Sequence, residues 1–206
     1  MNEYKYYTNT IIRAVVGLVL AYNMIPQNGT LPDIAGSNDG TIYGALSTKD
    51  GLSFNGVDDY VTLGNIGSVK SIAFRIKLKT TTEQIFEGAA NDKLILANAG
   101  TLTYSDYDNA YINGVDTNVI SAGIWYNVVI VSSTDVDNTA ATIALNNASY
   151  GNIELDDLRI YNYALSESEA QAYHNSFVKP VLIEDFRGNA VGDNYPLEWN
   201  LGGTGS

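Results

Sequence analysis

The acidic segment Glu154–Arg159 holds the residues of this sequence whose types and spacing are best suited to chemistry. Retaining glycosidases need two carboxylates about 5–5.5 Å apart, as an E-x-D-x-x-E pattern on one strand provides. Glu154 and Asp156 match the first two acids, but Arg159 stands where the last acid should be, so the general acid is missing. The sequence also has no cysteine, one histidine and no G-x-S-x-G or phosphate-loop pattern. We therefore predict that the protein is not an enzyme.

Asp156 suggests a different chemistry, because it belongs to a predicted strand over Ile153–Asn162. Asp156, Leu158 and Ile160 alternate along this strand and therefore share one face. If Leu158 and Ile160 point into a core, Asp156 lies inward at the end of the strand. A buried carboxylate without a partner is costly, so it needs either backbone amides at a turn or a cation.

The loop Asp33–Gly40 offers oxygen ligands for such a cation. The Asp33 carboxylate and the Asn38 side-chain amide are hard oxygen donors on a flexible loop, which suits calcium. The loop could therefore supply the remaining oxygens of a Ca²⁺ ion at Asp156. The alternative is an ordinary Asx-turn without a metal.

A tyrosine-rich segment is the best candidate for ligand binding. Tyr104, Tyr107 and Tyr111 supply flat rings for sugar faces, and polar side chains between them supply partners for sugar hydroxyls. The polar residues are Asp106, Asp108 and Asn109. The alternative is that these tyrosines are ordinary strand and rim residues of a tyrosine-rich fold.

The composition excludes several classes of protein. The 206 residues include 11 Lys and Arg against 23 Asp and Glu, which gives a net charge of −12. Such a surface repels phosphate backbones and anionic lipid, so we predict that the protein binds neither nucleic acid nor membrane. The absence of cysteine excludes thiol catalysis, disulfide scaffolds and thiolate zinc sites.

The elements that must position these residues are mainly strands. In Ser71–Lys79, apolar residues alternate with Arg75, Lys77 and Lys79, which is typical of a half-buried antiparallel strand. Trp125–Val131 is apolar on both faces, as a central strand would be. Further short strands are separated by Asn-Gly and Gly-rich turns. These strands are predicted over Leu94–Leu96, Ala110–Ile112, Thr142–Leu145 and Ile153–Tyr161.

One helix is predicted after the last strand. Ser166 and Glu169 form a capping box, and the helix runs towards Phe177 before Pro180. The organisation is therefore an N-terminal arm (1–16), a domain (17–179) and a C-terminal extension (180–206) that packs on the domain or on a neighbouring chain. The apolar run Ala14–Tyr22 is too short to span a bilayer and is predicted as a buried first strand.

Three segments resemble one known family. The segments Gly51–Val61 (GLSFNGVDDYV), Leu155–Ser166 (LDDLRIYNYALS) and Asp33–Thr41 (DIAGSNDGT) are similar to motifs of the laminin-G-like, concanavalin A-like jelly-roll domains. In order and spacing the resemblance covers about residues 17–177. It implies an all-β, two-sheet antiparallel β-sandwich with one short C-terminal helix. It also implies a structural Ca²⁺ ion where the loop and the Leu155–Ser166 segment meet, with Asp33, Asn38 and Asp156 as its ligands by motif position.

Two function classes follow from these features. We predict a structural or adhesive subunit of a large assembly such as a bacteriophage virion, bound to partner subunits, with glycan attachment as a possible activity of its loops. No export signal, no cysteine and an acidic Asn-, Gly- and Tyr-rich surface favour this class. The alternative is a secreted or cell-surface carbohydrate-binding module.

Overall fold

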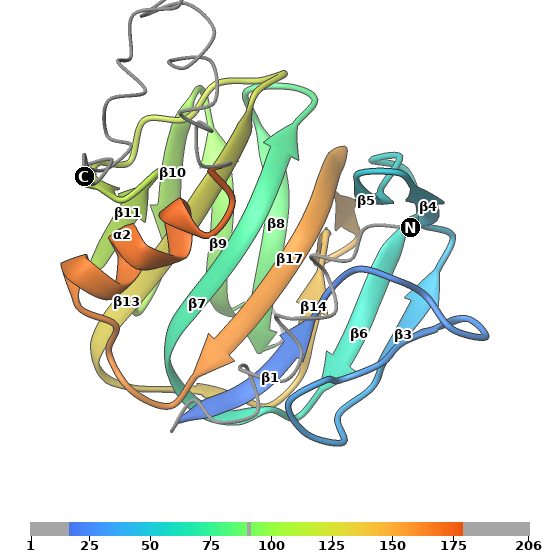
Figure 1. Ribbon diagram of the computed structural model, residues 1–206. Coiled ribbons are helices and arrows are strands. Elements are labelled where there is room, and N and C mark those ends of the chain that lie inside the picture. Colours follow the sequence, from blue (N-terminus) through green and yellow to red (C-terminus); the bar gives the residue numbers. More distant parts are fainter. Residues whose placement is uncertain (1–16, 90–91, 179–206) are drawn as a thin grey trace, which may run out of the picture.

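The computed structural model describes residues 17–89 and 92–178. Figure 1 shows that these residues form two facing β-sheets, with a short helix on the outer side of one of them. The paired strands of both sheets run antiparallel. The predicted all-β sandwich with one short C-terminal helix is therefore confirmed for the described residues.

The first sheet, here called the eight-stranded sheet, runs in the order β12-β11-β13-β7-β17-β5-β4, and β1 also pairs with β17. The helix α2 lies on this side of the molecule (Figure 1). The strands are β12 (Val115–Asp116), β11 (Asn109–Ile112), β13 (Trp125–Asn138), β7 (Gly67–Leu78), β17 (Ile153–Tyr161), β5 (Gly51–Ser53), β4 (Leu46–Thr48) and β1 (Leu18–Tyr22).

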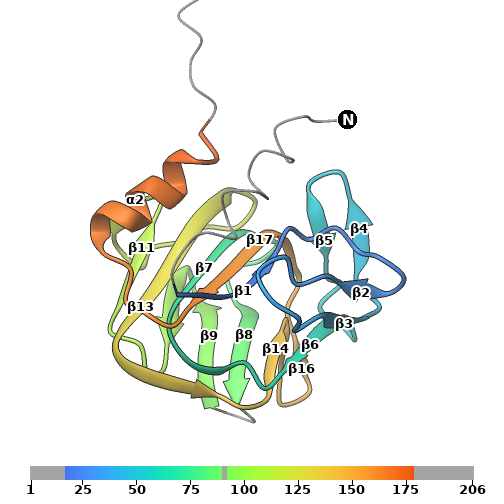
Figure 2. The same cartoon turned by 60° about the horizontal axis from the view of Figure 1, so that its bottom comes forward.

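The second sheet, here called the seven-stranded sheet, runs in the order β10-β9-β8-β14-β6-β3-β2. Figure 2 shows β8, β9 and β14 of this sheet on the other side of the sandwich from β13 and β17. The strands are β10 (Thr101–Tyr104), β9 (Asp92–Asn98), β8 (Glu83–Ala89), β14 (Ala141–Ile143), β6 (Tyr60–Gly64), β3 (Gly40–Tyr43) and β2 (Thr30–Leu31), and a separate hairpin joins β15 (Leu145–Asn146) to β16 (Ser149–Tyr150).

The core lies between the two sheets and consists of alternate side chains from both. On β7, Ile72, Phe74 and Ile76 are buried, as the alternation in the sequence predicts. On the facing sheet, Val61 and Leu63 of β6 are buried in the same cluster. Each such side chain contributes about 1.5–3 kcal/mol by leaving water, so this shared interior is the main stabilising element of the fold.

The predicted central strand is also confirmed. β13 lies between β11 and β7, and Val128 and Val129 are both buried although they point to opposite faces. Val128 belongs to the core between the sheets. Val129 belongs to a second apolar cluster on the outer face of the eight-stranded sheet. The strand is apolar on both faces because the helix covers its outer side.

The helix α2 (Glu167–Asn175) has the predicted capping box at its N-terminus. The Ser166 hydroxyl accepts a hydrogen bond from the Glu169 amide, and the Glu169 carboxylate accepts one from the Ser166 amide. Ala170 and Tyr173 of the helix are buried against the outer apolar cluster. The cap fixes where the helix starts, and the buried face fixes which side it turns to the sheet.

The ends of the chain are only partly described. The predicted first strand is confirmed over Leu18–Tyr22, which is β1. The predicted N-terminal arm (1–16) and the C-terminal extension (180–206) lie outside the described residues. In the described part of the chain, no helix has the length and apolar character needed to cross a membrane.

Candidate functional site

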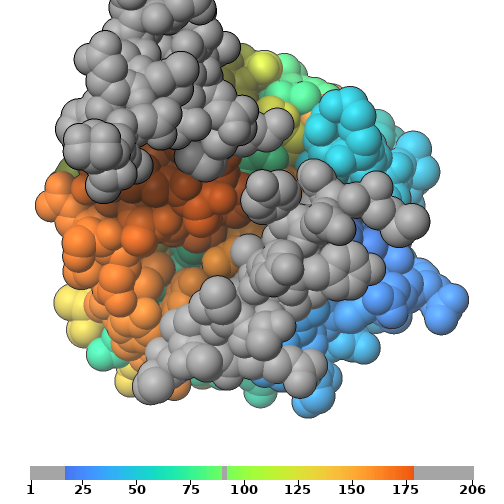
Figure 3. Space-filling model, in the orientation of Figure 1, coloured from blue at the N-terminus to red at the C-terminus, as the bar shows by residue number. Residues whose placement is uncertain are grey.

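A cavity of about 240 Å³ opens between α2 and the end of β17, on the outer face of the eight-stranded sheet. Figure 3 shows this face of the molecule, with the orange side chains of the C-terminal helix along its left side. A concave site that combines apolar walls with a few polar groups is the usual form of a ligand site. The cavity is lined by Arg159, Tyr161, Tyr163, Leu165, Glu169, Ala172, Tyr173 and Ser176.

A β-bulge in β17 sets which of its side chains reach the cavity. The pairing of β17 with β7 shifts between Leu155 and Asp157. Beyond this bulge, Asp157, Arg159 and Tyr161 alternate on the outer face of the sheet, whereas the residues between them belong to the core. Bulges commonly redirect side chains in this way.

One face of the helix α2 supplies the opposite wall of the cavity. Glu169, Ala172, Tyr173 and Ser176 follow the spacing i, i+3, i+4 and i+7, so they lie on one face of the helix. That face turns towards β17, where Tyr173 reaches the strand directly. The cavity is thus built by one strand and one helix that lie next to each other in the sequence.

A buried ion pair forms the floor of the site. Arg159 Nε lies 3.0 Å from Asp157 Oδ2, and the Tyr173 hydroxyl donates a hydrogen bond of 2.9 Å to the same oxygen. Burial raises the pKa of the Asp157 carboxyl, because desolvation outweighs the opposing effect of the Arg159 charge. Burial likewise raises the pKa of the Tyr173 hydroxyl, which therefore stays a hydrogen-bond donor.

Two tyrosine rings and a fixed carboxylate form the rest of the walls. The rings of Tyr161 and Tyr163 meet edge to face, with centroids 5.7 Å apart. The Tyr163 hydroxyl donates to Glu169 Oε1 at 3.1 Å, and the Ser166 amide holds the other oxygen at 2.8 Å. Burial and the nearby Glu169 raise the pKa of Tyr163 to about 12, so its ring is uncharged at neutral pH. The site can offer apolar ring surface, guanidinium donors and a carboxylate acceptor together.

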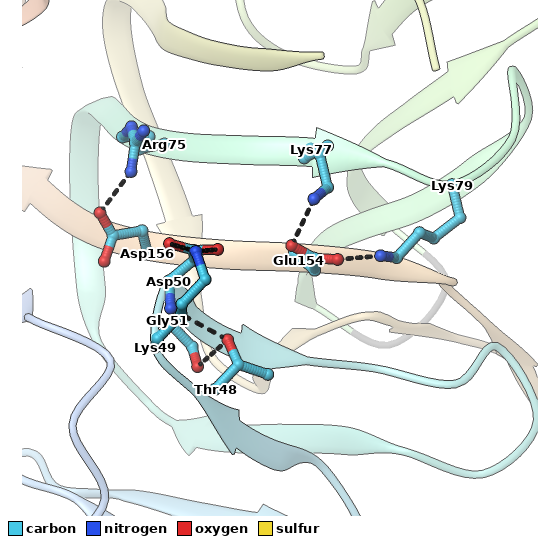
Figure 4. A network of polar contacts seen from close by, with 9 residues as sticks. All are labelled: Thr48, Lys49, Asp50, Gly51, Arg75, Lys77, Lys79, Glu154 and Asp156. Carbon is cyan, nitrogen blue, oxygen red and sulfur yellow. Dashed lines mark hydrogen bonds and ion pairs between the residues drawn. The ribbon is translucent and has the colours of Figure 1, made fainter. Parts of the chain in front are cut away.

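A strip of ion pairs runs along the same sheet face beside the cavity (Figure 4). Lys77 Nζ lies 2.7 Å from Glu154 Oε2, and Lys79 pairs with the other oxygen of that carboxylate. Arg75 pairs with Asp156 at 2.7 Å. The predicted solvent-facing basic side of β7 is therefore balanced by the acids of β17.

Aromatic rings connect this strip to the cavity. The Arg75 guanidinium lies 4.5 Å from the centroid of the Trp125 ring and 5.6 Å from that of Phe177. Phe177 in turn packs edge to face on Tyr173, with centroids 5.2 Å apart. The ion-paired strip and the cavity are neighbouring parts of one surface.

The prediction that Asp156 points inward is wrong. The bulge between Leu155 and Asp157 breaks the alternation, so Leu155 is buried and Asp156 turns outward. Its carboxylate pairs with Arg75 instead of meeting the core (Figure 4). The carboxylate therefore has a cationic partner from the neighbouring strand.

The Asp33 loop is organised by backbone amides. Asp33 Oδ1 accepts hydrogen bonds of 3.0 Å from the amides of Ala21 and Ala35, and Oδ2 accepts one of 3.1 Å from Asn38. The bond from Ala35 is that of an Asx-turn, which was the alternative to a metal. The Asn38 side chain donates to the Leu63 carbonyl at 3.1 Å.

Two of the three predicted calcium ligands, Asp33 and Asn38, thus lie together in one loop, where the Asn38 amide donates to the Asp33 carboxylate, whereas Asp156 pairs with Arg75. Among residues 17–89 and 92–178, no group of three or more His, Asp or Glu side chains is arranged to hold a metal ion. The geometry of Asp33, Asn38 and Asp156 does not fit a shared calcium ion.

The predicted tyrosine cluster is dispersed over the fold. Tyr104 lies on β10 of the seven-stranded sheet and packs against the main core. Tyr107 is buried in that core. Tyr111 lies on β11 and packs into the outer cluster of the other sheet. Tyr104 and Tyr111 thus lie on two different sheets, and Tyr107 lies in the segment that connects their strands.

Sequence reasoning missed the cavity tyrosines. Tyr161 and Tyr163 lie in the segment Leu155–Ser166 and Tyr173 lies in the predicted helix, but none of them is among the ligand-binding candidates named from the sequence. The usable signal was the i, i+2 spacing of Tyr161 and Tyr163 next to a capped helix with a tyrosine on its buried side. Tyr104 and Tyr111 also lie on short strands, so residue type alone does not show which pair of tyrosines lines a cavity.

No protein-family model matches this sequence, and a comparison with curated proteins gives no match. Solved structures of Trypanosoma rangeli sialidase are similar in fold. The complex with 2,3-difluorosialic acid has a TM-score of 0.59 at 14% identity over 78% of this chain. The complex with sialic acid has a TM-score of 0.57 at 14% identity over 83% of this chain. This chain spans about a third of the sialidase chains, with 33% of each covered.

The receptor-binding domain of the botulinum neurotoxin C/D mosaic serotype is also similar. Its TM-score is 0.50 at 12% identity, and the match covers 78% of this chain and 51% of that one. At such identities the likeness shows the β-sandwich fold. The part of the predicted resemblance that is confirmed is the β-sandwich fold.

These comparisons contradict the prediction that the protein is not an enzyme, because sialidases are enzymes. The prediction depended on the missing third acid at Arg159, which applies to glycosidases with a carboxylate pair. Sialidases use a tyrosine nucleophile and are outside that rule. A missing acid in the Glu154–Arg159 segment is therefore no ground for excluding enzymes that share this fold.

Proposed function

We propose that this chain is a carbohydrate-binding domain that holds one sugar unit of a glycan in the cavity between β17 and α2. The observation that carries the proposal is that three tyrosine rings, the Arg159 guanidinium and the Glu169 carboxylate line one open cavity. A sugar ring presents apolar C–H faces, which pack on aromatic rings, and hydroxyls, which need both donors and acceptors. The site supplies all three kinds of contact.

The size of the cavity supports a small ligand. Its volume of about 240 Å³ is below the range of about 300–1,000 Å³ that is usual for drug-sized ligands. One sugar unit therefore suits it better than a longer segment. The similar sialidases were solved with sialic acid or its relatives bound, which supports a saccharide as the class of ligand.

The charges around the cavity favour a neutral sugar over an acidic one. Arg159 is balanced by Asp157, and Glu169 adds a further negative charge at the wall. The whole chain carries a net charge of −12, which also repels anions. We therefore expect neutral sugars to bind more tightly than sialic acid or uronic acids.

A glycan array followed by titration calorimetry tests the proposal. For the best neutral glycan, Tyr163→Ala should weaken binding by about fivefold, which corresponds to the roughly 1 kcal/mol of one aromatic contact. Tyr163→Phe keeps the ring and should retain most of the affinity. Circular dichroism and melting curves of each variant establish that it is folded.

Tyr104→Ala is the matched control, because Tyr104 is a half-buried tyrosine on the other sheet. It should leave the affinity unchanged. A loss of binding in Tyr104→Ala but not in Tyr163→Ala would overturn the cavity and favour the cluster predicted from the sequence. The absence of any glycan ligand on the array would overturn the proposed function itself.

The assembly role stays a prediction, together with its partner subunits and its place in a virion. The secreted or cell-surface alternative also stays a prediction. Size-exclusion chromatography with light scattering separates the two. A stable monomer that binds glycans supports the module, whereas a higher oligomer without glycan binding supports the assembly subunit.

A further inference from the structure

Three tyrosine rings lie in a row on the opposite side of the molecule, two on the seven-stranded sheet and one on the β15–β16 hairpin. Tyr43 of β3 and Tyr60 of β6 are cross-strand neighbours, and their rings stack with centroids 4.4 Å apart and planes 7° from parallel. Tyr150 of β16 follows, with its ring centroid 6.1 Å from that of Tyr60 and tilted by 46°. We call Tyr43, Tyr60 and Tyr150 the tyrosine row.

The tyrosine row lies on the outer face of the sheet and takes no part in the core. Ile42 and Val61, the neighbours of Tyr43 and Tyr60 in the sequence, point to the core instead. Tyr43 remains 43% exposed although one face of its ring is covered by Tyr60. In the described part of the chain, the hydroxyls of the tyrosine row have no hydrogen-bond partner. Packing into the core and hydrogen bonding of the hydroxyls therefore do not account for these three rings.

Uncharged polar side chains surround the tyrosine row. Thr41 pairs with Thr62, and Thr62 with Thr142, so that three threonines lie side by side on the face that carries Tyr43 and Tyr60. The next residue across this sheet is Glu87, opposite Thr142, and it is buried. In a chain with a net charge of −12, this face offers hydroxyls rather than carboxylates.

A pair of amides ties the β15–β16 hairpin, which carries Tyr150, to β8. Asn146 Nδ2 donates a hydrogen bond of 3.2 Å to Gln84 Oε1, and Asn146 belongs to the same hairpin as Tyr150. Gly151 lies so close to the Gln84 carbonyl that a side chain at this position would collide with it. This close approach holds the hairpin on β8, and with it the amides and the Tyr150 ring.

We infer that the tyrosine row is a second binding site, for the chain of a neutral polysaccharide lying across the outer face of the seven-stranded sheet. The exposed ring surface would pack on the C–H faces of successive sugar units, while the threonine hydroxyls and the amides would bond their hydroxyls. The site differs from the cavity in form, because it is a row of surface rings rather than a pocket. The inference shares the ligand class of the proposed function, but it does not depend on the cavity.

Affinity electrophoresis in gels that contain soluble galactomannan, xyloglucan or arabinan tests the inference. Tyr43→Ala and Tyr60→Ala should each reduce the retardation by at least about fivefold in apparent affinity for the polysaccharide that binds. Tyr43→Phe keeps the ring and should bind like the unchanged chain. Tyr43 is exposed, so its substitution should leave the melting temperature nearly unaltered.

Tyr163→Ala is the control that separates this site from the cavity. If Tyr163→Ala alone reduces retardation and the tyrosine-row variants do not, the inference is overturned and the cavity stands. If the tyrosine-row variants alone reduce retardation, the inference stands and the cavity is not the site that binds these polysaccharides. A gel that contains the acidic polymer alginate is run for comparison. If none of the three neutral polysaccharides retards the protein, or if only alginate does, the neutral-polysaccharide site is overturned.

Discussion

At the scale of single residues, the ion pair of Asp157 and Arg159 is held in an apolar setting between β17 and α2. We predict that Asp157→Ala lowers the free energy of unfolding by about 3–5 kcal/mol, because it leaves the Arg159 guanidinium, whose side chain is only 18% exposed, without its carboxylate. Replacing both residues together, as Asp157→Leu with Arg159→Met, should cost less than Asp157→Ala alone. Urea denaturation of the three variants measures these differences.

The exposed pair of Lys49 and Asp50 is the matched control for this prediction. Lys49→Ala should change the free energy of unfolding by less than about 1 kcal/mol, since a solvated ion pair contributes little. If Asp157→Ala were no more costly than Lys49→Ala, the Asp157–Arg159 pair would not be buried in solution. The floor of the proposed sugar site would then be wrong.

The partners of Asp33 lead to a prediction about metal removal. Its carboxylate already accepts three backbone amides, so the loop needs no cation to satisfy it. We predict that EDTA leaves the melting temperature unchanged and that added Ca²⁺ does not raise it. Asp33→Ala should lower the melting temperature with or without EDTA, because three amides lose their acceptor.

Differential scanning calorimetry decides between the two accounts of the Asp33 loop. A fall in melting temperature with EDTA that Ca²⁺ reverses would restore the calcium ion. The loss of that response in Asp33→Ala would then place the ion at this loop. The sequence predicts Asp33 as an oxygen ligand of the loop, but the backbone amides that satisfy its carboxylate are set by the fold.

At the scale of elements, the capping box of α2 connects the stability of the helix to pH. Hydrogen bonds from the Ser166 amide and hydroxyl lower the pKa of Glu169 below its ordinary value. The ionised carboxylate is thus the form that the fold favours, and its contribution is present above the ordinary pKa of glutamate and lost as pH falls through the lowered value. Glu169→Gln should therefore cost about 0.5–1 kcal/mol near neutral pH and less at about pH 3.

Urea denaturation of the unchanged chain and of Glu169→Gln, near neutral pH and at about pH 3, measures how much stability the substitution costs at each pH. Glu167→Gln is the control, because Glu167 lies in the same first turn but outside the capping box. A difference between Glu169→Gln and the unchanged chain that stays constant with pH would show that the carboxylate charge is not what stabilises the helix start.

The elements that the sequence predicted are those whose signals are local. The alternation in Ser71–Lys79 and the capping box at Ser166 depend on residues a few positions apart, and the structure confirms both. The bulge at Asp156 could not be predicted, because it arises from how β17 pairs with β7 and not from the residue types of β17 itself. The error about Asp156 follows from applying strict alternation through that bulge.

At the scale of the whole molecule, the two facing sheets were predictable but the grouping of side chains on their outer faces was not. The tyrosine row joins residues 43, 60 and 150, which come from strands far apart in the sequence. The pairing of β3 with β6 and the docking of the β15–β16 hairpin on β8 bring them together. Tyr104, Tyr107 and Tyr111 are close in the sequence, yet the chain turns between them and sends them to different layers.

The shared interior of the two sheets leads to the last prediction. Phe54 is among the most deeply buried side chains, with 1% of its surface exposed, and it directly follows β5. We predict that Phe54→Ala lowers the free energy of unfolding by about 3–5 kcal/mol, because the sandwich cannot fully close over the missing ring. Leu46→Ala on the neighbouring strand β4 is the control, since Leu46 is 69% exposed and should change stability by less than about 0.5 kcal/mol. Equal effects of the two substitutions in urea denaturation would mean that the layers around β5 do not pack as a closed core, and both proposed glycan sites would lose the rigid sheets that carry them.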